Sequence, residues 1–338
     1  MADRLVTLDP KRATQQEAIA ARVGVLRRTE WVVFVFLLYA QAVAFLLPGS
    51  PDIRLRACLI DLGVIAIGGL LVLADAAKPT LAISVIRDWF PLAVLLLAYQ
   101  EMGWFTVPHF GNALESQWVI WDRVVLRGGA KAAIEAFGPV LPSILDISYF
   151  LVYTLGPFSV AVLYLYRKRV RVDRFLFIFV LSVLLCYVQF PFWPSQPPRL
   201  LFSGEDVPTY DTIFRRFNWW MLGNYSIHTS VFPSAHVAGA FACAFSMRRA
   251  LPEHKWVSRL LWVLAILIAT ATVYGRYHYL ADALAGLFVA ALVTALVGGR
   301  REIQRCPANP ADETSHTPRT RKAEGDIPPA AGGPSLYR

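Results

Sequence analysis

Two histidines, an aspartate, a serine and an arginine lie in three short motifs whose residue types suit phosphoryl transfer. His278 and Asp282 are four positions apart, so on a helix they share one face. The aspartate could then accept a ring N–H and fix the tautomer, which leaves the other ring nitrogen free to attack phosphorus. Taken alone, this pair is more often a capped helix start beside an interfacial histidine.

The second motif, Pro233–His236, opens an apolar segment. Ser234 suits a helix cap, and the free N–H groups of a helix N-terminus attract phosphate. His236 could protonate a leaving oxygen. The third motif is Arg199, which follows two prolines and could grip two phosphate oxygens. Each motif alone suggests only a cap or a headgroup contact, but three in order at successive segment borders favour one site.

The rest of the chain is too apolar for an ordinary soluble domain. Of 338 residues 56% are hydrophobic, and the mean hydropathy is +0.46. Because a membrane span needs about 20 apolar residues, we expect an all-α, polytopic transmembrane helical bundle with about eight spans. The expected spans are 31–48, 56–77, 81–102, 144–166, 173–192, 233–250, 256–274 and 279–298.

These spans define a transmembrane catalytic domain over 30–302, with the motifs in 191–282. Residues 1–29 are expected to be a cytoplasmic tail, with an interfacial helix and a solvated tail as open alternatives. Residues 303–338 are rich in Pro, Gly and charge, which predicts a disordered cytoplasmic tail. In 113–137 the spacing of tryptophans and apolar residues predicts a surface helix, either at headgroup depth or packed on the bundle.

The net charge of +9 is distributed unevenly along the chain. Lys and Arg cluster in alternate connections, which the positive-inside rule assigns to the cytoplasm. With eight spans, both termini are then cytoplasmic and all three motifs lie on the extracytoplasmic side. We therefore expect a multi-pass protein of the cell membrane, and a nucleic-acid partner is disfavoured.

The motifs resemble the signatures of the type 2 phosphatidic acid phosphatase superfamily, and most closely its inositol phosphorylceramide synthase-like, or inositolphosphotransferase, branch. The resemblance implies a six-helix core and a phosphohistidine intermediate. It implies that His278 attacks phosphorus, that Asp282 orients it and that His236 is the leaving-group acid. It also implies that Ser234 and Arg199 bind the substrate phosphate. No metal and no cofactor are required in this scheme.

The chain departs from the phosphatase pattern at three positions. Phe192, Leu200 and Thr272 stand where that pattern has lysine, proline and arginine. Arg276 is near the third motif but two residues before His278, so it is only a candidate headgroup ligand. A site with fewer cations suits a phosphodiester better than a dianionic monoester. This favours transfer of a headgroup over hydrolysis.

Other ionisable residues fall in apolar stretches, where function is the default hypothesis. Glu101 and Asp146 lie near the outer ends of their spans and are candidate headgroup ligands, or structural pairs. The predicted function is a lipid phosphotransferase whose partners are a phospholipid donor and an alcohol or lipid acceptor. The alternatives are a lipid phosphate phosphatase, a non-catalytic lipid transporter, and a metal site built from His228 and the motif residues. The sequence leaves the oligomeric state open.

Overall fold

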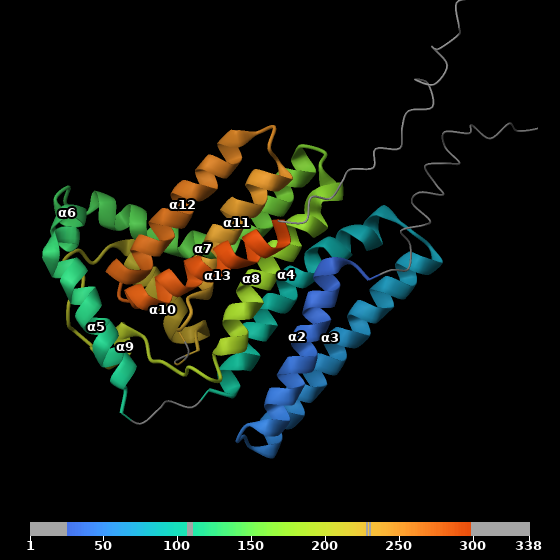
Figure 1. Ribbon diagram of the computed structural model, residues 1–338, viewed down its shortest axis with the longest axis horizontal. Helices are drawn as coiled ribbons and strands as arrows, with labels where there is room; N and C mark the ends of the chain where they lie inside the picture. The colour runs from blue at the N-terminus through green and yellow to red at the C-terminus, as the bar shows by residue number, and fades with distance from the viewer. Residues whose placement is uncertain (1–25, 107–110, 228, 230, 299–338) are drawn as a thin grey trace, which may run out of the picture. The chain divides into compact units, whose positions relative to one another are not determined.

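The computed structural model describes residues 26–106, 111–227, 229 and 231–298, and within these ranges the chain forms helices and no strand (Figure 1). The long helices are α2 Arg28–Leu46, α3 Pro51–Ala77, α4 Leu81–Trp104, α7 Val140–Leu165, α8 Val172–Gln189, α11 Ala235–Ala250, α12 Lys255–Tyr274 and α13 Leu280–Gly298. The shorter elements are α5 Ala113–Val125, a π-helical turn Leu126–Ala130, α6 Lys131–Glu135, a 3-10 turn Arg169–Arg171, α9 Pro198–Leu201 and α10 Ile213–Tyr225.

The eight predicted spans correspond to the eight long helices, so the polytopic all-α fold is confirmed. Seven of these helices are long and apolar enough to cross a membrane. The eighth, α11, has 16 residues, because it starts after the Ser234 cap and ends before Pro252. Its short length fits a helix enclosed by others rather than one that faces lipid on its own.

Helix α11 is the centre of the bundle. Along it, Ala238, Gly239, Ala240, Cys243 and Ala244 are all buried. Small side chains let helix backbones approach closely, which is how membrane helices pack without a hydrophobic driving force between them. Helix α11 therefore contacts α7, α8, α12 and α13 at once. The helices that carry the second and third motifs are thus direct neighbours.

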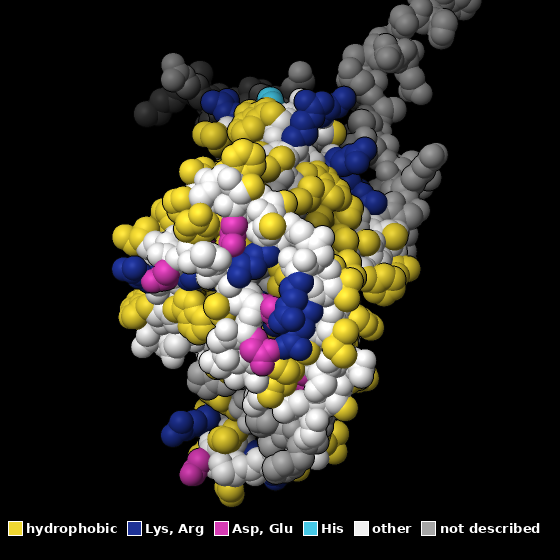
Figure 2. Space-filling view, turned by 90° about the vertical axis from the view of Figure 1, so that its left-hand side faces the viewer, with side chains coloured by type: hydrophobic (Ala, Val, Ile, Leu, Met, Phe, Trp, Pro, Cys, Tyr) yellow, Lys and Arg dark blue, Asp and Glu magenta, His cyan; other side chains and the backbone are white. Residues whose placement is uncertain are grey.

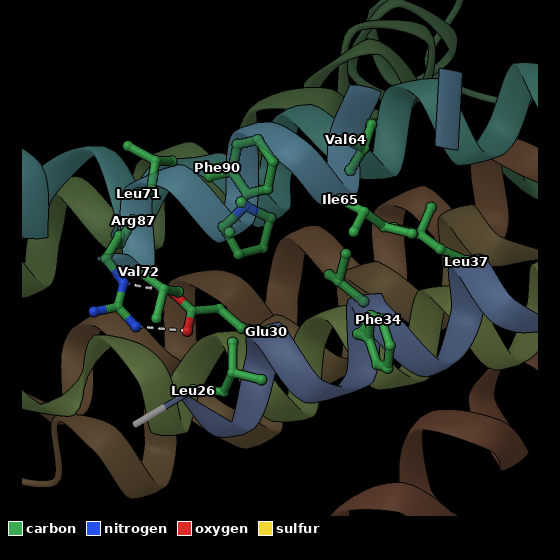
Figure 3. Close-up of a pocket in the computed structure, with 14 residues that line it drawn as sticks. Leu26, Glu30, Phe34, Leu37, Val64, Ile65, Leu71, Val72, Arg87 and Phe90 are labelled. Atoms are coloured by element: carbon green, nitrogen blue, oxygen red, sulfur yellow. Dashed lines mark hydrogen bonds and ion pairs between the residues drawn. The ribbon is translucent and has the colours of Figure 1, made fainter. Parts of the chain in front are cut away.

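Helices α2 and α3 lie side by side and pack on α4, with α2 also against α8 (Figure 1). One end of this group is fixed by charge, because Arg87 on α4 donates to Glu30 on α2 at 2.8 and 2.7 Å (Figure 3). Arg87 also pairs with Asp75 on α3, so one guanidinium joins three helices. The adjacent Asp88 accepts from Arg27 and Arg169 instead. Buried charges of this kind are tolerated when they are paired and hydrogen-bonded.

The predicted surface segment 113–137 forms α5, the π-helical turn and α6, with a kink at Gly129, whose φ is 120°. Trp121 is exposed, whereas Trp118 is buried, so only one of the two tryptophans faces outward. The long connection before α11 is ordered around α9 and α10. The tail and interfacial-helix predictions for 1–29 and the disorder predicted for 303–338 concern residues almost wholly outside the described ranges.

Candidate active site

The three motifs line one cavity of about 410 Å³ among α4, α7, α8, α11 and the adjoining connections. Arg199, His236 and His278 all contribute to its wall, together with aromatic and aliphatic side chains from the membrane-spanning helices. Arg199 and His278, which are 79 positions apart in the chain, therefore lie close together in space. The convergence that the sequence motifs predicted is present in the fold.

His278 lies in the turn between α12 and α13, where its ring is held by backbone. Its Nδ1 is 3.1 Å from the carbonyl oxygen of Val231 and 3.4 Å from Oδ2 of Asp282. A carbonyl can only accept, so Nδ1 carries the proton and Nε2 keeps its lone pair. Burial lowers the pKa of His278 well below its ordinary value, and the nearby His236 and Arg199 lower it further. The imidazole is therefore neutral and nucleophilic.

Asp282 is fully buried in the first turn of α13 and has two contacts in this region. Its Oδ2 accepts the backbone N–H of Tyr279 at 2.9 Å and faces Nδ1 of His278. The sequence predicted that this carboxylate would accept the imidazole N–H. In the structure the shorter contact of that N–H is with the Val231 carbonyl, and the carboxyl group of Asp282 lies slightly farther from the same ring nitrogen.

His236 lies in the first turn of α11 and contributes to the wall of the cavity. Its ring centroid is 5.5 Å from that of His278, so both imidazoles can contact one phosphoryl group. Its Nε2 lies 3.1 Å from the hydroxyl of Tyr153, and Tyr149 stacks on its ring at 5.3 Å. These two tyrosines of α7 fix the orientation of the imidazole.

A backbone hydrogen bond holds Arg199 in place, whereas its side chain makes only two long hydrogen bonds. Its N–H donates to the carbonyl of Arg276 at 3.1 Å. The guanidinium reaches the carbonyl of Tyr277 at 3.3 Å and the hydroxyl of Ser226 at 3.4 Å. Both contacts are long for hydrogen bonds, and no carboxylate pairs with Arg199 among the described residues. The guanidinium is therefore available to an anionic ligand.

Ser234 joins the second motif to the third. Its hydroxyl caps α11 by accepting from Val237 N at 3.3 Å, and its own N–H donates to the carbonyl of Asp282 at 3.0 Å. This link needs Gly286 on α13, because a Cβ there would lie 2.4 Å from the carbonyl oxygen of Ser234. Only a glycine permits this approach of the two backbones. The hydroxyl of Ser234 is thus engaged in the cap, and the amides of the first turn of α11 are the donors without an intrahelical partner.

Asp122 on α5 is a residue of the site region that the motifs did not reveal. Its Oδ2 accepts from Arg276 at 2.6 Å and its Oδ1 accepts from Leu280 N at 2.8 Å. Arg276 has a left-handed backbone conformation, with φ 63°, and its side chain is almost fully buried. On the same helix Trp118 stacks on Phe232. Helix α5 therefore clamps the turn that carries His278.

The three candidate headgroup ligands do not line the cavity. Arg276 is bound to Asp122. Asp146 on α7 accepts from Arg215 at 3.0 Å and from Thr212 at 2.7 Å, and thereby holds α10 on the bundle. Glu101 is buried next to Asp61 of α3. Each side chain is engaged in joining helices.

The metal-site alternative has little to build on within the described ranges. His228 lies outside them. The residues that are described contain no group of three or more His, Cys, Asp or Glu side chains arranged to hold a metal ion.

Three contributors to the site escaped the sequence motifs: the Val231 carbonyl, the Tyr153 hydroxyl and Asp122. A backbone carbonyl has no signature in sequence, and Tyr153 is one of 13 tyrosines in an aromatic-rich chain. Asp122 had a usable signal, because it lies four residues after Trp118 and therefore on the same face of the helix. A polar residue beside a tryptophan on the buried face of a surface helix indicates a specific partner.

Comparison with known proteins is consistent with this site. Residues 130–296 match the model of the PAP2 superfamily. A PA-phosphatase related-family protein of Dictyostelium discoideum is 35% identical over 101 residues, which cover 28% of this chain. The chain spans only 18% of that relative's length. No solved structure matches the chain.

Proposed function

We propose, on the premise that residues 130–296 are a PAP2 superfamily domain, that this protein moves a phospho-headgroup from a lipid donor to an alcohol or lipid acceptor through a phosphohistidine. Lipid phosphatase or phosphotransferase activity is general to the superfamily. The observation that carries the proposal is that His278, His236 and Arg199 line one cavity, with the two imidazole centroids 5.5 Å apart.

The reaction has two halves. In the first, Nε2 of His278 attacks phosphorus, the bond from phosphorus to the leaving oxygen breaks, and His236 supplies the proton that this oxygen takes up. In the second, the acceptor hydroxyl attacks the phosphohistidine, His236 removes the hydroxyl proton, and Nε2 leaves with its electron pair. The Val231 carbonyl and Asp282 stabilise the positive charge that develops on the His278 ring.

The charge of the cavity supports a phosphodiester donor. Among the described residues that line the cavity, Arg199 is the one Lys or Arg side chain. Arg276 is bound to Asp122, and the family's further cation positions hold Phe192 and Thr272. One guanidinium matches the single negative charge of a diester, whereas a terminal phosphate carries nearly two. We therefore favour the inositol phosphorylceramide synthase-like branch and headgroup transfer.

The apolar part of the cavity supports a lipid substrate. The cavity is also lined by Leu92 and Leu96 of α4, Pro157 of α7, and Phe179 and Val183 of α8. Leu96 is 64% exposed, so this wall continues to the lipid-facing surface of the bundle. A headgroup at the histidines would thus leave its acyl chains in an apolar channel.

The first test is turnover by purified protein with a headgroup-labelled phospholipid. His278→Ala should abolish transfer, because it removes the nucleophile, and the wild type should yield an acid-labile, base-stable labelled protein. His254→Ala is the matched control, since His254 stacks on Tyr166 away from the cavity. Near-normal transfer by His278→Ala would refute the assignment.

The second test separates transfer from hydrolysis. The labelled donor is incubated with and without an alcohol or ceramide acceptor. Transfer predicts a labelled acceptor product and slow release of label without acceptor. Rapid release of free phosphate from a monoester without acceptor would establish the phosphatase instead.

A further inference from the structure

A second pocket lies at the end of α11 and α12 that is remote from the histidines. Its volume is about 370 Å³ and it is formed around the α11–α12 connection. Helix α11 runs from His236 to the pocket, a distance of about 20 Å at the rise of an α-helix. The lining residues are Arg248, Leu251, Pro252, Lys255, Ser258, Arg259 and Trp262.

The pocket carries three positive charges without a carboxylate to balance them. Within the described ranges no carboxylate pairs with Arg248, Lys255 or Arg259. The nearest acid in the connection, Glu253, accepts instead from Arg171, at 2.9 and 3.0 Å. Converging cations that lack an internal partner favour an anion from outside.

The start of α12 adds to this preference. Its cap residue, His254, makes no side-chain hydrogen bond to the helix, and its first turn contains no acid but begins with Lys255. Positive side chains at a helix N-terminus are opposed by the helix dipole, so a bound anion would relieve this repulsion. Figure 2 shows Lys and Arg side chains gathered at the upper end of the molecule, where the α11–α12 connection lies in Figure 1.

Beside these charges, the exposed surface of α12 is apolar. Trp256, Leu260, Val263 and Ile266 follow one another along α12 at helical spacing, with exposed fractions of 52%, 39%, 55% and 55%. A ligand that satisfies both parts has an anionic head and hydrocarbon chains. Free phosphate would satisfy only the head.

We infer that this pocket binds the phosphate headgroup of one anionic phospholipid, whose acyl chains lie along the exposed face of α12. The guanidinium of Arg259 and the ammonium of Lys255 contact the phosphate, and Trp262 packs against the glycerol region. Basic pockets between membrane helices are suited to such headgroups. The inference is independent of the proposed reaction, because it concerns binding at the opposite end of the helices.

The experiment is native mass spectrometry of the purified protein with added phosphatidylglycerol or phosphatidylcholine. The test variant is Lys255→Gln/Arg259→Gln. The control is Arg167→Gln/Arg174→Gln, which removes two exposed cations from outside the pocket. We expect one retained phosphatidylglycerol on the wild type and the control, and roughly 30-fold weaker retention on the test variant, from about fivefold per cation.

The other outcomes count against the inference. Equal loss in both double variants would show general surface attraction rather than a site. Equal retention of phosphatidylcholine would show that charge does not select the lipid. Removal of phosphatidylglycerol by excess inorganic phosphate, with phosphate retained in its place, would show an anion site without a role for the acyl chains. Melting temperature of each variant without added lipid verifies that the compared proteins are folded.

Discussion

At the scale of single residues, the site is built around one neutral imidazole. The Val231 carbonyl fixes the proton of His278 on Nδ1, and the buried carboxylate of Asp282 lies behind it. The same ring has a pKa lowered by burial and by the positive charge of Arg199. A nucleophilic histidine must be deprotonated to react, so this electrostatic setting extends its working range to acidic pH.

This setting predicts the pH dependence of kcat/KM. Because the pKa of His278 is below its ordinary value of 6.5, the acid limb should lie below pH 6.5. Arg199→Gln removes a positive charge that disfavours the imidazolium, so the acid limb should move to higher pH. The rate itself should fall by about 10²-fold, because the phosphate loses the hydrogen bonds that the guanidinium donates to it. Arg167→Gln, outside the cavity, should leave the limb unchanged, and an unmoved limb in Arg199→Gln would contradict this electrostatic account.

Asp122 is expected to act as a positioning residue. Asp122→Asn leaves Arg276 buried without its charge partner, which should cost about 3–5 kcal/mol of unfolding free energy. It should also lower kcat with little change in KM, because the turn of His278 loses its clamp. In Asp122→Asn/Arg276→Met, stability should largely return.

The matched control for this clamp is Asp75→Asn, which weakens a different buried pair, with Arg87. It should lower stability while kcat of the folded protein is retained. Unchanged kcat in folded Asp122→Asn, measured beside this control, would remove Asp122 from the catalytic arrangement.

At the scale of elements, the decisive contact is between α11 and α13. The Ser234 N–H meets the carbonyl of Asp282, and Gly286 leaves room for that approach. A backbone hydrogen bond thus joins the start of α11, which carries the second motif, to the start of α13, which carries Asp282 of the third motif. Their small residues, rather than their polar ones, bring the second and third motifs together.

Gly286→Ala should therefore disturb the arrangement of the two motifs, although Gly286 does not line the cavity. The new methyl group would lie 2.4 Å from the Ser234 carbonyl oxygen, so the helices must separate at a cost of about 1–3 kcal/mol. We expect a lower melting temperature and a large loss of turnover. Gly63→Ala on α3 is the control, since nothing lies within 4 Å of its added methyl group. Wild-type turnover in Gly286→Ala would show that this close approach is not needed.

At the scale of the whole described bundle, the chemistry and the basic connections lie at opposite helix ends. The histidines are at the start of α11 and α13, whereas Arg248, Lys255 and Arg171 lie at the far ends of α11, α12 and α8. By the positive-inside rule we propose that the basic end faces the cytoplasm and the cavity opens on the extracytoplasmic side.

Cysteine labelling tests this orientation. In a background in which Cys58, Cys186, Cys243 and Cys306 are replaced, a single cysteine is introduced at the exposed position Asp211 or Arg167. A membrane-impermeant maleimide should label Asp211→Cys on intact cells, because α10 lies at the cavity end. It should label Arg167→Cys only after the membrane is opened. The reverse pattern would invert the proposed topology.

The sequence by itself determined the membrane-helical fold and the reactive residue types. Seven of the eight predicted spans needed no tertiary information, because a span is set by local hydropathy and length, whereas α11 is shorter than a span. The order of the arginine, serine–histidine and histidine–aspartate motifs also indicated one phosphate site. These are local properties, and the structure contains each of the predicted helices.

Tertiary structure decided which polar groups face the cavity and which hold the helices together. Arg276, Asp146 and Glu101 were candidate headgroup ligands and Arg199 the predicted phosphate ligand, and of these four only Arg199 lines the cavity. The Val231 carbonyl became the partner of His278 because a connecting segment passes beside it. The physical reason is that a buried charge must find a partner, and the partner is set by packing between distant segments rather than by neighbours in the chain.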